Sequence, residues 1–167
     1  MSQVIRKDYR PKKVFINLYG VLSRPQHVFL LWLTDQQYNN RSGNQMEAGD
    51  GVIILSSFSS QPESQKLVFQ ACVVLHPPIK VDQQWTYNEQ SGGKAETRVV
   101  PVIGPCFENL DLSNSDLFYE IYRERSNFRS GLTLPGGHNW QNADEQKRAI
   151  NKFVELRKRD DAIWNFR

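Results

Sequence analysis

Residues 49–78 constrain the fold of this chain more than any other stretch. A Gly-Asp-Gly turn precedes the apolar run Val-Ile-Ile-Leu, and a polar segment follows at residues 56–65. A second apolar run covers residues 67–75 and is followed by Pro77 and Pro78. Apolar, β-branched runs of this length, bounded by Gly, Ser and Pro, are typical of strands joined as a hairpin. We expect two consecutive antiparallel strands at the centre of a β-rich domain.

Apolar runs elsewhere predict three further strands, at residues 13–18, 27–34 and 97–103. Pro101 places the last of them at a sheet edge or a bulge, because proline donates no ladder hydrogen bond. Residues 35–45 predict a loop or a short helical turn, and residues 81–96 a long loop or a ragged hairpin.

Helices are predicted only late in the chain. Ser113 with Asp116 resembles a capping box before residues 114–126, and Asn142 with Glu145 begins a second helix with an apolar stripe at Ile150, Phe153 and Val154. The fold class is therefore α+β: a bent antiparallel sheet or small barrel of about five or six strands, flanked by helices. The length of 167 residues predicts a single domain over residues 1–167.

Composition favours an intracellular, cytoplasmic protein with no membrane contact. Hydrophobic residues make up 39% of the chain, and no run approaches the roughly 18 apolar residues of a membrane helix. The N-terminus lacks the apolar core of a secretory signal. Cys72 and Cys106 are interpreted as buried free thiols, with a redox pair as the alternative.

The net charge of +3 is mild, but its distribution is informative. Lysine and arginine concentrate between residues 6 and 13 and again from residue 123 onward. If the two ends of the chain meet in space, they form one basic face suited to a polyanion.

Catalytic motifs are missing from the sequence. It contains no phosphate-binding Gly-rich loop, no HExxH, no GxSxG and no metal-ligand spacing of Cys or His. His27, His76 and His138 lie in separate segments, and the acidic residues suggest a solvated surface. We expect no catalytic residue, no metal and no cofactor.

Two tryptophans lie in polar surroundings, Trp85 and Trp140. Each either folds back as a lid on the core or offers a stacking surface for a base or another flat ligand. Trp32, inside an apolar run, belongs to the core or lines a pocket at the strand's end. Trp164 is expected to anchor the last helix.

Residues 49–78 also carry a resemblance to a known family. The Gly-Asp-Gly turn, the strand that ends at Ser56 and Ser57, and the next strand with its Pro-Pro exit together resemble the central signature of PUA-like domains, especially the EVE and YTH-related branch. A helix followed by an Arg-containing run at residues 117–134 is similar in placement to the closing part of that branch. Residues 13–18 and the helix after Asn142 look like additions.

The resemblance implies a nucleic-acid-binding module that takes a modified (methylated) or flipped base into an aromatic pocket, as the recognition domains of modification-dependent restriction systems do. DNA is favoured over RNA, and further domains or subunits of a larger complex are expected. The implied base-binding residues are Trp32, Thr34, Ser56, Ser57, Phe58, Trp85 and Tyr87. The implied phosphate-binding residues are Lys12, Lys13, Arg123, Arg125 and Arg129.

Two other classes of function remain open. One is a small nucleic-acid-processing enzyme, such as a ribonuclease, on the same fold, with His138 or His76 as general base. The other is a protein-interaction domain in which exposed aromatic residues meet a partner chain.

Overall fold

The structure is a computed structural model that describes residues 6–19, 28–40, 42–57, 66–85, 96–111, 131–134 and 143–164. Its strands are β1 (Val14–Tyr19), β2 (Val28–Thr34), β3 (Gly51–Ser57), β4 (Lys66–Val74), β5 (Ile79–Trp85), β6 (Glu96–Ile103), β7 (Cys106–Asp111) and β8 (Gly131–Thr133). Its helices are α1 (Asp35–Asn39), the short 3-10 helix η1 (Gly43–Gln45) and α3 (Ala143–Lys158). All these strands belong to one eight-stranded sheet in the order β2-β6-β4-β3-β1-β8, with β5 beside β6 and β7 beside β4.

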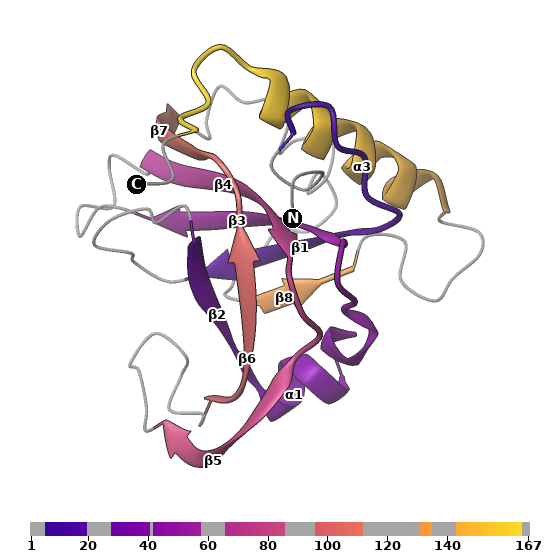
Figure 1. Cartoon of the computed structure of the whole chain (residues 1–167), viewed down its shortest axis with the longest axis vertical. Helices are drawn as coiled ribbons and strands as arrows, with labels where there is room; N and C mark the ends of the chain where they lie inside the picture. Colours follow the sequence, from indigo (N-terminus) through magenta and orange to yellow (C-terminus); the bar gives the residue numbers. More distant parts are fainter. Residues whose placement is uncertain are drawn as a thin grey trace.

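The sheet is curled, and five of its strands form a half-barrel. Figure 1 shows α3 lying over β1, β3 and β4, all of which it contacts. Residues 6–13, here called the lead, run beside α3 before they enter β1. This architecture agrees with the predicted α+β class and small-barrel shape.

Alternation along the strands divides the core into two layers. In β1, Val14 and Ile16 face outward, where they pack with Phe153 of α3, while Phe15 faces inward. The inner layer also contains Leu31 of β2 and other residues of the concave face. Because successive strand residues point to opposite faces, each position in the sheet is either on the outer face, toward α3, or on the inner face.

The two antiparallel strands predicted within residues 49–78 are confirmed. β3 and β4 pair antiparallel from Gly51 opposite Val73 to Ser57 opposite Leu67. The structure also confirms strands close to residues 13–18, 27–34 and 97–103, and a late helix that carries Phe153 on its buried face. Cys72 and Cys106 are buried free thiols, as expected.

The prediction of an antiparallel sheet was wrong for one pair of strands. β1 and β3 run parallel, with Val14 opposite Gly51 and Tyr19 opposite Ser56. Parallel neighbours need a long crossover connection, and the chain between them, which includes β2 and α1, supplies it. The sheet is therefore mixed.

The edge position predicted for Pro101 was also wrong. β6 lies inside the sheet, between β2 and β4, and its pairing with β2 is in register at Pro101. The carbonyl oxygen of Pro101 accepts a 2.9 Å hydrogen bond from the Leu75 amide. In a strand, the N–H and C=O of one residue point toward the same neighbouring strand. The Pro101 nitrogen, which has no hydrogen, therefore points toward the turn after β4, and the pairing with β2 loses no hydrogen bond.

The sheet has more strands than the five or six predicted. Residues 79–85 form β5 and pair with β6, which agrees with the hairpin interpretation and not with a loop. β7 and β8 were not predicted at all, and residues 35–45 contain the short helices α1 and η1. The helix predicted over residues 114–126 lies outside the described residues.

Candidate nucleic-acid interface

The outer face of the sheet carries a row of apolar side chains beyond the part that α3 contacts. Trp32 lies opposite Val99, which lies opposite Ile79, so these three side chains cross β2, β6 and β5 on one face. Leu30 and Pro101 form the next pair on this face. Leu30 and Ile79 are 51% and 41% exposed, and Trp32 is half-buried. We call these five residues the outer row.

Thr34 has a structural role at the end of β2. Its hydroxyl accepts a 3.2 Å hydrogen bond from the Gln37 amide, and the Gln37 side chain accepts one of 3.0 Å from the Thr34 amide. This reciprocal pair is a capping box that starts α1. Thr34 is 6% exposed, and the helix cap occupies its hydroxyl.

A polar cluster holds α1 to the start of β6. Asp35 accepts a 2.6 Å hydrogen bond from Thr97 and forms an ion pair with Arg98. These bonds, that from Thr97 foremost, lower the pKa of Asp35 below its ordinary value. The Arg98 guanidinium lies 3.8 Å from the centre of the Tyr38 ring, a cation–π contact. Sequence reasoning missed the pairing of Tyr38 with Arg98, because the two residues are far apart in the chain.

The structure separates the expected base-binding residues into two groups. Glu96 of β6 lies opposite Thr34 of β2 on one side and opposite Trp85 of β5 on the other. These residues are therefore at the end of β2 that carries Trp32. Ser56 and Ser57 lie at the end of β3, and β4 stands between β3 and β6. Two further expected residues lie outside the described residues, Phe58 and Tyr87.

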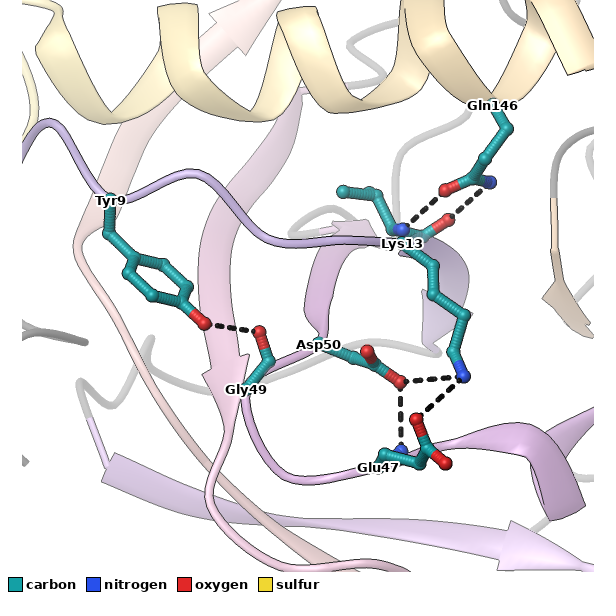
Figure 2. A network of polar contacts seen from close by, with 7 residues as sticks. Tyr9, Lys13, Glu47, Gly49, Asp50 and Gln146 are labelled. Carbon is teal, nitrogen blue, oxygen red and sulfur yellow. Dashed lines mark hydrogen bonds and ion pairs between the residues drawn. The ribbon is translucent and has the colours of Figure 1, made fainter.

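The Gly-Asp-Gly turn is the centre of a polar network, shown in Figure 2. Gly49 has a φ of +93°, a conformation that favours glycine, and its carbonyl oxygen accepts a 2.7 Å hydrogen bond from the Tyr9 hydroxyl. Asp50 is 4% exposed and accepts a 2.8 Å hydrogen bond from the Glu47 amide. Burial raises the pKa of Asp50. The turn thereby fastens the lead to the sheet.

Of the expected phosphate-binding residues, the structure describes Lys12 and Lys13, and they differ. The Lys13 ammonium lies 3.3 Å from Glu47 and 3.4 Å from Asp50, so it is engaged inside the network of Figure 2. Lys12 is exposed, and no ion pair joins it to another described residue. The other three lie outside the described residues, Arg123, Arg125 and Arg129.

Of the three histidines, the structure describes His76. His76 is exposed on the turn after β4, and its Nδ1 lies 2.7 Å from the carbonyl oxygen of Pro77. His27, His138 and Trp140 lie outside the described residues. In the ranges that the structure describes, no group of three His, Cys, Asp or Glu residues is placed to hold a metal ion.

Comparison with known proteins adds no family: no protein-family model matches the chain, and no curated protein matches its sequence. None of the described helices is both long enough and apolar enough to cross a membrane.

Proposed function

We propose that this chain is a nucleic-acid-binding module with a PUA-like fold, which reads a modified or flipped base. The observation that carries the proposal is the position of Trp32, a half-buried indole on the outer face. Exposed Leu30 lies on the same strand, and exposed Ile79 lies on the far side of Val99. Aromatic side chains on open sheet faces stack with unpaired bases, and each stack contributes about 1 to 3 kcal/mol.

The base in this proposal stacks on the Trp32 ring, and the aliphatic side chains of the outer row exclude water around it. Trp85 ends β5 two strands away from β2 and belongs to the same end of the sheet. We favour DNA over RNA and a role as the recognition part of a larger assembly, such as a modification-dependent restriction system. Two buried free thiols fit a reducing, cytoplasmic compartment.

Fluorescence anisotropy of labelled oligonucleotides, methylated and unmodified, tests the proposal. Trp32→Ala is expected to weaken binding by about 5- to 150-fold, the equivalent of one lost stack. Trp32→Phe keeps a ring and should retain most of the affinity. Leu30→Ala is the comparison on the same face: it removes apolar area without removing a ring, and it should weaken binding less than Trp32→Ala does. Weak, salt-insensitive and equal binding of all oligonucleotides by the wild-type chain would contradict the proposal.

A second candidate is a protein-interaction domain, favoured by the exposure of Leu30 and Ile79. Large exposed aliphatic side chains next to an aromatic residue are typical of interface cores. In that case Leu30→Ala and Ile79→Ala would weaken partner binding as much as Trp32→Ala, which base stacking does not predict.

A further inference from the structure

The two basic ends of the described chain meet on α3. The lead runs along the helix (Figure 1), and Arg157 of α3 donates a 3.0 Å hydrogen bond to the carbonyl oxygen of Arg6. Further along, Arg10 donates a 2.9 Å hydrogen bond to the Asn151 side chain. These contacts fix the cations of the lead beside those of the helix.

This region concentrates the positive charge of the protein. Residues 6–13 contain five basic residues and one acidic residue, and residues 143–164 contain six basic and five acidic residues. The first segment therefore carries a net charge of +4 and the second +1, so that together they carry +5, whereas the whole chain carries +3. The rest of the sequence is weakly acidic.

At least three of the six carboxylates in these two segments form an ion pair with a neighbouring cation. Glu155 pairs with Lys152 at 3.3 Å, and Asp161 pairs with Arg159 at 2.7 Å. In contrast, Lys147, Arg148 and Lys158 are exposed, and no ion pair joins them to other described residues. They recur with Asn151 along the solvent side of α3, opposite buried Phe153.

A shallow depression of about 510 Å³ lies on the same side of α3. Its lining residues are Arg10, Asn151, Val154, Glu155, Lys158 and Arg159. Guanidinium and amide donors surround it, and Glu155 is the one carboxylate among these described residues. We define the α3 face as these six residues together with Lys147 and Arg148.

We infer that the α3 face binds the sugar-phosphate backbone of a nucleic acid. This inference rests on the proposed function, and it assigns the phosphate contacts to a helix that the family resemblance did not include. Lys147 and Lys158 lie about 16 Å apart along the helix axis, which matches about five phosphates of one DNA strand. The Arg10 fork and the Asn151 amide supply donors of the kind that contact phosphate oxygens.

The composition of the α3 face favours nucleic acid over an acidic membrane. A helix that lies in a membrane interface presents large apolar side chains to the lipid. Val154 is the one apolar residue of the α3 face and is half-buried, while the apolar side of α3 packs against the sheet.

The test measures oligonucleotide affinity against salt for charge variants of equal fold. In Lys147→Gln/Arg148→Gln, both side chains are exposed, so thermal unfolding should be unchanged and any loss of binding is electrostatic. We expect the slope of log K against log salt on duplex DNA to become shallower by about 2, since each lost phosphate contact removes about 0.9. Glu155→Gln is the control of opposite sign and should tighten binding several-fold.

The outcomes separate this inference from the proposed function. Wild-type affinity in Lys147→Gln/Arg148→Gln, beside salt-dependent binding by the wild type, overturns the inference and leaves the proposed function standing. The inference is also overturned if Lys147→Gln/Arg148→Gln loses binding to phosphatidylserine vesicles while its oligonucleotide binding is unchanged. If the variant weakens all sequences equally while Trp32→Ala removes the preference for a modified base, both are supported. If the wild-type chain binds no oligonucleotide at all, the proposed function fails and the inference with it.

Discussion

The guanidinium group of Arg157 in α3 donates a 2.8 Å hydrogen bond to the carbonyl oxygen of Ala71 in the centre of β4. The Arg157 side chain is fully buried, and it also reaches the lead through Arg6 and lies 4.6 Å from the centre of the Trp164 ring. Burial lowers the pKa of Arg157 to about 10, which still leaves it charged at neutral pH. One charged residue thus joins the lead, the sheet and the C-terminal segment.

Replacing Arg157 should therefore destabilise the whole molecule. Arg157→Leu leaves the Ala71 and Arg6 carbonyl oxygens without these donors, and we expect the free energy of unfolding to fall by about 3 kcal/mol. For a chain of this size the melting temperature would fall by about 9 °C, measurable by circular dichroism. Lys158→Leu, one residue later and exposed, is the control and should change stability by about 0.5 kcal/mol or less. Equal melting temperatures for the two variants would contradict this role.

Gln146 fixes the other end of α3 to the sheet. Its side-chain oxygen accepts a 2.6 Å hydrogen bond from the Val14 amide, and its side-chain nitrogen donates one of 3.1 Å to the Val14 carbonyl oxygen. Gln146→Ala removes both bonds and should cost about 1 to 2 kcal/mol. Gln146→Glu keeps only the acceptor oxygen, so its stability should lie between those of the wild type and Gln146→Ala. Hydrogen exchange provides the local measurement, because the Val14 amide should lose protection in Gln146→Ala before other β1 amides do.

Asn17 is a polar residue in the inner layer of the core. It is 1% exposed, lies opposite Ile54 and Leu132, and its side-chain oxygen has no hydrogen-bond partner among the described residues. Because a buried amide oxygen without a hydrogen bond is unfavourable, Asn17→Leu, which has a similar shape, should raise the free energy of unfolding by about 1 to 2 kcal/mol. Urea denaturation measures it. Asn17→Ala is the control that removes the amide but leaves a cavity; a loss of stability in Asn17→Leu would refute the expectation.

Much of the central fold could be predicted from the sequence because its signals are local. The Gly-Asp-Gly turn and the two apolar runs specify β3 and β4, and the apolar stripe around Phe153 specifies α3. The parallel pairing of β1 with β3 could not be predicted, because its partners are brought together only by a long connection. β8 has three residues, too few for a period to emerge.

The candidate site was less predictable, for reasons visible in particular residues. Trp32 lies in a continuous apolar run, which hides the alternation that would assign it to the outer face. Lys13 was expected to bind phosphate, but Glu47 and Asp50 engage it through contacts across the fold. The sequence predicts a basic face only if the two ends of the chain meet. The contact between Arg10 and Asn151 shows that they do, and it joins residues too far apart in the sequence to be paired by a local pattern.

The pH dependence of stability should distinguish Asp50 from Asp161. Burial raises the pKa of Asp50, whereas the hydrogen bond from Arg159 lowers the pKa of Asp161. A carboxyl with a raised pKa in the folded state contributes most stability when protonated, below the unfolded value of about 3.9, and loses that contribution as the pH rises through the folded value. A carboxyl with a lowered pKa does the opposite: its contribution is present above about 3.9 and is lost as the pH falls through the folded value.

Asp50→Asn and Asp161→Asn remove these titrations, and the amide oxygen introduced by Asp50→Asn can still accept the hydrogen bond from the Glu47 amide. As the pH falls from neutral toward about 4, the wild type should gain stability relative to Asp50→Asn. On further acidification below about 3.9 it should lose stability relative to Asp161→Asn. Urea denaturation of the three proteins over this pH range measures both differences. A wild type that loses stability relative to Asp50→Asn on acidification would show that the ion pair with Lys13, and not burial, dominates the titration of Asp50.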